Sequence, residues 1–178
     1  MRFSLKFNFN WKIFIQSIKI GLPSGLQQTF VAMGMMALVG IVNTFGTNVI
    51  AAYTAAGRID SFATMFAMSF SQALSTFTGQ NIGASRFDRI KNGFRSTLLV
   101  SSSVCLGITL VIFVFRNQLM RIFTHDPEVI AIGAEYLMIV SAFYLLFSAM
   151  FVTNGVMRGA GATLIPMFIT LFSLWIIR

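Results

Sequence analysis

The sequence contains very little charge. Only 10% of its 178 residues are charged, whereas 56% are hydrophobic. A soluble domain needs polar side chains to cover its surface, and this chain has too few of them. The composition excludes an ordinary soluble globular protein and indicates an integral membrane protein of about one domain.

Acidic residues are especially scarce, with five of them against thirteen lysines and arginines and a net charge of +8. In a soluble protein this excess would suggest nucleic-acid binding. Here the basic residues lie mostly between hydrophobic runs, where they orient membrane spans and meet anionic lipid head groups. No basic stretch is interleaved with stacking aromatic residues in a polar context, so we expect membrane lipids as partners and no nucleic acid.

Cysteine and histidine occur once each. Cys105 lies in an apolar run and can form no intrachain disulfide. His125 lies in a loop with Asp126 and Glu128, where a solvated histidine is a better interpretation than a metal ligand. The sequence also lacks a Ser/His/Asp set, a cysteine–histidine cluster and a phosphate-binding glycine loop. We therefore expect no enzyme, no metal site and no ATP hydrolysis, so that any transport would depend on an ion gradient.

A short basic segment fixes the expected orientation in the membrane. It follows the second hydrophobic run and carries Arg86, Arg89, Lys91 and Arg95 against one acid, Asp88. Cytoplasmic loops carry the excess of lysine and arginine, so residues 84–95 should be cytoplasmic.

Counting outward from this loop predicts an all-α, multi-span helical bundle. The expected spans lie at about 20–42, 49–78, 96–115, 129–157 and 164–178. Pro127 should start the fourth span, and Pro23 should lie near the start of the first. Residues 1–19 are too polar to span and are expected to be an interfacial cytoplasmic linker, with residues 20–178 as the membrane domain. The last run holds about fifteen residues where a span needs roughly twenty, so we expect a truncated final helix.

Three pairs of glycines are spaced four residues apart and could bring helices close together at the cytoplasmic ends of the spans. The alternative is that glycine is simply common in membrane helices. The pairs are Gly21 and Gly25, Gly79 and Gly83, and Gly155 and Gly159.

Arg58 and Asp60 are the most unusual residues, because they fall near the middle of the second expected span. Charges at that depth are costly and are often functional. Residues two apart do not face each other on a helix, so a direct ion pair is not expected. The two residues could relay protons or cations or contact substrate, or they could be polar anchors that face a water-filled cavity.

Four uncharged polar residues also fall inside the expected spans. They could line a transport pathway or form hydrogen bonds between helices. These candidates are Gln27, Gln28, Gln72 and Asn154.

Several segments in their order resemble the multidrug and toxic compound extrusion (MATE) transporters. They are GLPSGLQQ, AAYTAAGRIDSFA, QALSTFTGQNIGA with its basic tail, GVMRGAGAT followed by PM, and SLWIIR. The resemblance covers nearly all of the chain and implies one lobe of a twelve-helix transporter, with helices seven to eleven present and the first lobe missing. It further implies exchange of Na⁺ or H⁺ for organic, often cationic, drugs or metabolites across a bacterial inner membrane, with no cofactor besides the coupling ion.

The resemblance also bears on the ion site. One branch of the family uses acidic residues in helices seven and ten, and these positions fall near Val31 and Phe147, neither of which can hold a cation or a proton. The chain is closer to the branch whose acidic site lies in the first lobe. Two other functions remain open: a flippase of related fold for lipid-linked precursors, which would need a basic cavity, and a truncated membrane protein that transports nothing.

Overall fold

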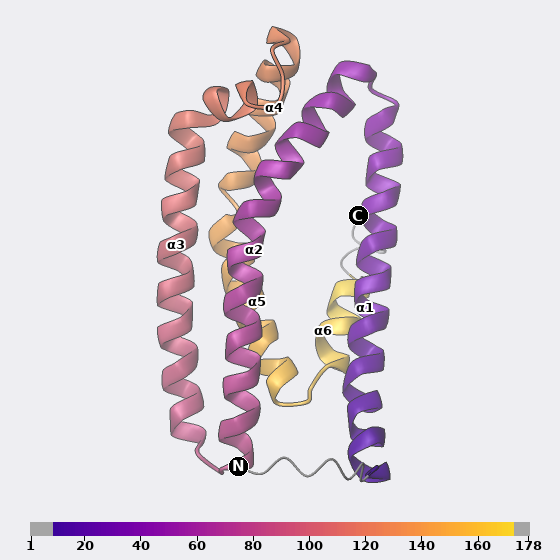
Figure 1. The fold of residues 1–178 in the computed structure, drawn as a ribbon, viewed down its shortest axis with the longest axis vertical. Helices are drawn as coiled ribbons and strands as arrows, with labels where there is room; N and C mark the ends of the chain where they lie inside the picture. Colours follow the sequence, from indigo (N-terminus) through magenta and orange to yellow (C-terminus); the bar gives the residue numbers. More distant parts are fainter. Residues whose placement is uncertain (1–8, 173–178) are drawn as a thin grey trace.

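The computed structural model describes residues 9–172, and throughout this range the regular structure is α-helical (Figure 1). The predicted all-α helical bundle is therefore confirmed. The helices are α1 (Trp11–Asn43), α2 (Thr47–Gly83), α3 (Phe87–Arg121), α4 (Pro127–Ser141), α5 (Tyr144–Gly159) and α6 (Leu164–Phe172).

The helix starts follow from local side-chain chemistry. The Asn10 side chain accepts hydrogen bonds from two amides of the first turn of α1, which begins at Trp11. Pro23 therefore lies inside α1 and not near its start as expected, and residues 11–19 continue the helix. At α4 the Asp126 side chain accepts from the amides of Glu128 and Val129, and Pro127 is the first helical residue, as the sequence predicts. A proline fits there because the first amides of a helix have no intrahelical partner.

The fourth expected span, 129–157, is not one straight helix. Helices α4 and α5 are bent by 51° at a short break between them. At the break the Ser141 carbonyl accepts a 3.1 Å hydrogen bond from Thr109 Oγ1 of α3, and Ser141 Oγ donates to the Met138 carbonyl at 3.2 Å. Side chains that bond to main-chain carbonyls in this way are a common cause of helix bends.

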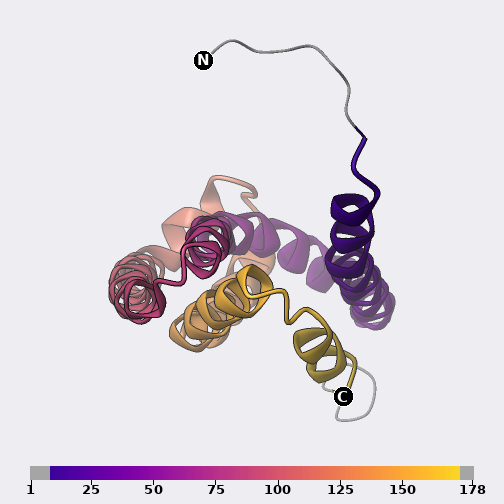
Figure 2. The ribbon, with the colours of Figure 1, turned by 90° about the horizontal axis from the view of Figure 1, so that it is seen from below.

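Helices α2 to α5 pack together as one body, and α1 pairs with α6 beside it (Figures 1 and 2). Helix α2 contacts α3, α4 and α5, which makes it the central element of the body. Helix α1 also contacts α2 and is joined to it by a turn in which Gly46 has a φ of +103°, a conformation that suits glycine.

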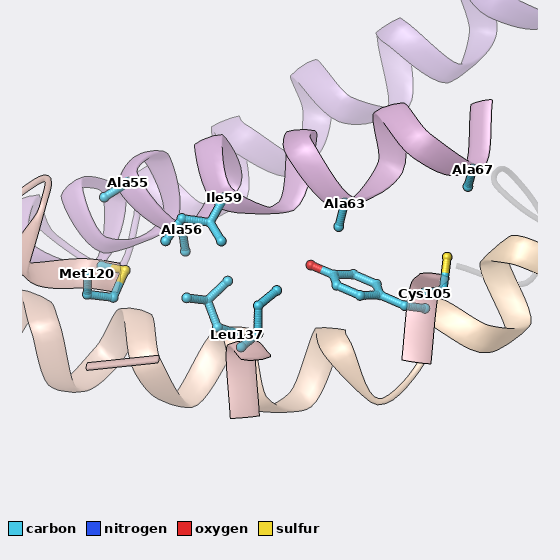
Figure 3. Close-up of a cluster of buried hydrophobic side chains, with 10 residues drawn as sticks. Ala55, Ala56, Ile59, Ala63, Ala67, Cys105, Met120 and Leu137 are labelled. Carbon is cyan, nitrogen blue, oxygen red and sulfur yellow. The ribbon is translucent and has the colours of Figure 1, made fainter. Parts of the chain in front are cut away.

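The core of the body is lined by small residues of α2. Ala55, Ala56, Ala63 and Ala67 point toward side chains of α3 and α4, which include Cys105, Met120 and Leu137 (Figure 3). Alanine has a short side chain, so the neighbouring backbones can approach closely. Helix α2 therefore has the most buried residues of the six helices, although it is not the most apolar of them.

Helices α1 and α3 are long and apolar enough to cross a membrane, and the bent pair α4–α5 would be a third span. Helix α2 has 37 residues but carries many serines and threonines as well as Arg58 and Asp60. Large hydrophobic side chains are exposed along α3, including Leu99, Leu110 and Phe113. Such surfaces are typical of contact with lipid or with other protein.

Candidate functional site

A small polar pocket lies where α1, α5 and the start of α6 meet. It has a volume of about 10 Å³, and two of the predicted site residues, Gln27 and Asn154, line it together. A site of this size has room for about one water molecule and not for a drug molecule. The other lining residues are Ser24, Arg158, Thr163 and Pro166.

Gln27 ties α1 to α6 across this pocket. Its Nε2 donates to Thr170 Oγ1 at 2.8 Å and to the Pro166 carbonyl at 3.3 Å. Thr170 Oγ1 donates to the same Pro166 carbonyl at 2.8 Å. Because Gln27 and Thr170 are 143 residues apart, these bonds join the two ends of the described chain.

Asp60 lies elsewhere, on α2 near the break between α4 and α5. The carboxylate is partly buried and lies beside the hydroxyl of Tyr144 and near the phenol of Tyr136. The Tyr136 ring packs edge-on against Tyr53 of α2, with ring centroids 5.6 Å apart. Two tyrosines, from α4 and α5, therefore lie near the carboxylate, and Tyr53 packs against one of them. We call Asp60, Tyr53, Tyr136 and Tyr144 the tyrosine cluster.

The remaining polar candidates are separate from both sites. Arg58, Gln28 and Gln72 are exposed. Arg58 and Asp60 are two residues apart, which places their side chains about 200° apart around a helix, and they differ in burial accordingly. The structure therefore divides the predicted polar residues among a pocket, a cluster and an outer surface.

The glycine pairs differ from one another. A Cβ atom at Gly155 would lie 2.5 Å from the Ser71 carbonyl oxygen, and one at Gly159 would collide with the Ser75 carbonyl oxygen. A Cβ at Gly79 would make an ordinary 3.5 Å contact with the Gly159 carbonyl. Gly21, Gly25 and Gly83 have open space where a Cβ would be placed. Close helix contact through glycine thus occurs between α2 and α5, where Ser71 Oγ also donates to the Phe151 carbonyl at 2.6 Å.

Sequence reasoning did not single out Tyr136 and Tyr144 or Arg158 as part of a site. The tyrosines could have been found by their rarity, since the chain has only three, and all three belong to the tyrosine cluster.

A wider, open groove of about 590 Å³ lies at the opposite end of the bundle, around the turn from α3 to α4. Nearby, Asn48 Nδ2 donates to Glu128 Oε2 at 2.8 Å and joins the start of α2 to the start of α4. The residues that line the groove are Asn117, Arg121, His125, Pro127, Ile130 and Ala131.

Comparison with known proteins adds the following. The family model described as MatE matches residues 23–178. The probable multidrug resistance protein YpnP of Bacillus subtilis is 35% identical over 94% of this chain and 38% of its own length. YoeA of the same organism, also described as a probable multidrug resistance protein, is 30% identical over 92% of this chain and 35% of its own length. A probable multidrug resistance protein NorM of Thermotoga maritima is 27% identical over 94% of this chain and 36% of its own length. The chain thus spans little more than a third of the length of these relatives.

Proposed function

Because the chain belongs to the MatE family, we propose that it is part of a multidrug efflux antiporter that exports organic, often cationic, compounds in exchange for Na⁺ or H⁺. The relatives described as probable multidrug resistance proteins support this proposal. Since the chain spans 38% or less of their length, the working transporter would include a further lobe. A bacterial inner membrane is the location that suits such a pump.

The proposed mechanism rests on one observation, that Gln27 and Asn154 line the same pocket. Gln27 is on α1 and Asn154 is on α5 of the α2–α5 body, and the two line one polar pocket. In this state the pocket is too small for a drug. Substrate would therefore enter only after α1 and α6 move away from α5, which is the kind of gated opening that alternating access requires.

The charges fit this proposal better than they fit a flippase for lipid-linked precursors. A flippase of this kind would need a strongly basic cavity. Arg58 is the residue that the sequence offers for such a cavity, and it is exposed. Among residues 9–172, Arg158 is the one basic residue that lines the small pocket.

The proposal is tested by ethidium efflux and drug susceptibility in a bacterial host that lacks its own pumps. Three proteins are compared: this chain alone, this chain fused to the segments of YpnP that it does not match, and the same fusion with Asn154→Leu. We expect gradient-dependent efflux from the fusion and its loss in the Asn154→Leu variant. The matched control is Gln72→Leu, which changes an exposed amide and should retain efflux.

Efflux by the chain alone would contradict the requirement for a second lobe. No efflux from a fusion that is present in the membrane would argue against drug export and favour the flippase or a protein that transports nothing.

A further inference from the structure

The groove at the turn from α3 to α4 has no part in the proposed drug pathway. Its volume of about 590 Å³ falls in the range of sites that hold small molecules, whereas the polar pocket has room for about one water. Asn117 and Arg121 of α3 supply hydrogen-bond donors to it, and His125 lies in the turn. The α4 residues that line it, Pro127, Ile130 and Ala131, are apolar. The groove therefore combines a polar side from α3 with an apolar side from α4.

Arg121 is the basic group of α3 that lines this groove. The other arginine at this end of α3 is used within the chain: Arg116 Nη1 donates to the Phe113 carbonyl at 2.9 Å, and the guanidinium lies 5.5 Å from the Phe113 ring centroid. Arg121 is exposed, and its side chain makes no such hydrogen bond within residues 9–172. A guanidinium presents its N–H donors in a planar fork that matches two oxygens of one phosphate group. Arg121 is therefore able to bind an anion from outside the chain.

The two acids of the turn already have partners. The Asp126 side chain accepts from the amides of Glu128 and Val129, and Glu128 accepts from Asn48 of α2. The capped start of α4 is thus not itself an anion site, and Pro127 has no amide hydrogen to offer. In net charge these acids balance the two arginines at this end of α3. Attraction of an anion must therefore come from direct contact with Arg121 and not from the general field of the turn.

An apolar stripe runs along α3 from the groove. Leu110 and Val114 precede Asn117 and Arg121 at spacings of four, three and four residues, so the four lie along one face of the helix. Leu110 is 57% exposed and Val114 is 63% exposed. At 1.5 Å per residue, Leu110 lies about 16 Å from Arg121 along the helix axis. This is about half of the roughly 30 Å hydrocarbon core of a bilayer, which is the depth that one leaflet occupies.

The position of α3 leaves this stripe accessible. Figures 1 and 2 place α3 at the edge of the bundle away from α1. Helix α3 is also long and apolar enough to cross a membrane. Its apolar stripe would then lie in the hydrocarbon region, with the groove at the level of the head groups.

We propose that the groove and the stripe together bind one anionic phospholipid. The phosphate group contacts Arg121 and Asn117, and one acyl chain lies along Val114 and Leu110. A soluble anion would use the groove alone, whereas a phospholipid matches both the donors and the apolar face that continues from them. By the expected topology this lipid belongs to the outer leaflet. The proposal goes beyond drug export and does not depend on it.

The test is native mass spectrometry of the purified 178-residue chain in detergent, titrated with dioleoyl phosphatidylglycerol or with dioleoyl phosphatidylcholine. The two lipids have the same acyl chains, but only the first has a net negative charge. We expect one phosphatidylglycerol to bind more tightly than phosphatidylcholine. Equal dissociation constants for the two lipids would overturn the proposal.

Arg121→Gln should raise the dissociation constant of the first phosphatidylglycerol by about tenfold, because it removes a charge-assisted hydrogen bond. Arg116→Gln is the matched control. It removes the same charge at the same end of α3, but from a position about 140° away around the helix. Equal losses in the two variants would mean general attraction to a basic end and no site in the groove.

Arg121→Lys provides a second test at the same position, which decides the question if Arg121→Gln does not fold. Lysine keeps the charge but loses the planar fork. We expect the dissociation constant to rise by about threefold, since a single N–H contact replaces a forked one. An unchanged constant would contradict direct contact between the phosphate and Arg121.

The apolar half of the site is tested with Leu110→Gln. Its matched control is Val111→Gln, since Val111 is 52% exposed but lies about 100° away around α3. Leu110→Gln should weaken phosphatidylglycerol binding several-fold and Val111→Gln should not. If both variants bind as the unchanged chain does, no acyl chain lies on the stripe.

Glycerol phosphate separates a lipid site from a site for soluble anions. It carries a phosphate group without acyl chains, and we expect it not to displace phosphatidylglycerol at equal concentration. Displacement would mean that the groove binds soluble phosphate compounds, which would overturn the proposed lipid site. None of these measurements requires transport, so the lipid site and the proposed drug export can fail independently.

Discussion

Ser101 of α3 and Ser148 of α5 share a 2.7 Å hydrogen bond between their hydroxyl groups, and both side chains are fully buried. The bond fixes one point of contact between two long helices of the α2–α5 body. In a membrane protein such a pair contributes modestly, on average about 0.6 kcal/mol.

We expect Ser101→Ala and Ser148→Ala each to lower the free energy of unfolding by about 1 kcal/mol, because each leaves the other hydroxyl buried without a partner. The double variant should cost less than the sum of the two. The measurement is denaturant unfolding in detergent micelles, and strictly additive effects would mean that the two hydroxyls are not coupled.

Gly159→Ala should destabilise the chain by about 1–3 kcal/mol, because the added methyl group would collide with the Ser75 carbonyl on α2. Gly25→Ala is the matched control, since a Cβ at Gly25 meets nothing within 4 Å. Gly25 lies inside α1, where alanine gains helix propensity, whereas Gly159 is the last residue of α5 and gains less. Equal unfolding free energies for the two variants would argue against close packing of α2 on α5.

Gln27→Leu should loosen α6 from α1, because it removes the donor to Thr170 and Pro166 at nearly constant side-chain size. Hydrogen exchange should become faster in residues 164–172 and stay unchanged in α3. Gln28→Leu changes an exposed neighbour and serves as the control. Unchanged exchange in α6 after Gln27→Leu would mean that other contacts hold this helix.

The orientation in the membrane can be tested with the single cysteine replaced by serine. In that background, Ser85→Cys should react with a membrane-impermeant maleimide only after the cells are opened, because the neighbouring basic residues 86–95 should be cytoplasmic. His125→Cys, in the exposed turn between α3 and α4, should react in intact cells. The reverse result at both positions would invert the topology.

Much of the helical architecture could be predicted from the sequence, because apolar runs and turn residues act locally. The start of α4 illustrates this: Asp126 caps the helix and Pro127 begins it, as expected from the two residues alone. Pro23 shows the limit of such local predictions. A proline in an uncharged run is typical of a helix start, but this helix begins at Trp11.

The candidate sites were harder to predict because they depend on which helices become neighbours. Gln27 and Asn154 were selected for being polar within apolar runs, but only the packing of α1, α5 and α6 shows that they share a pocket. Asp60 was selected in the same way, yet its tyrosine partners come from α4 and α5.

The separation between Gln27 and its partners on α6 also bears on how the protein is made. Of the described helices, α1 leaves the ribosome before the others, and the residues that it bonds on α6 follow 139 and 143 positions after Gln27. No residue of α1 is buried. During synthesis α1 can contact α2 early, whereas its hydrogen bonds to α6 can form only after α6 has been made. The pocket between α1, α5 and α6 is then the last part of the described chain to form.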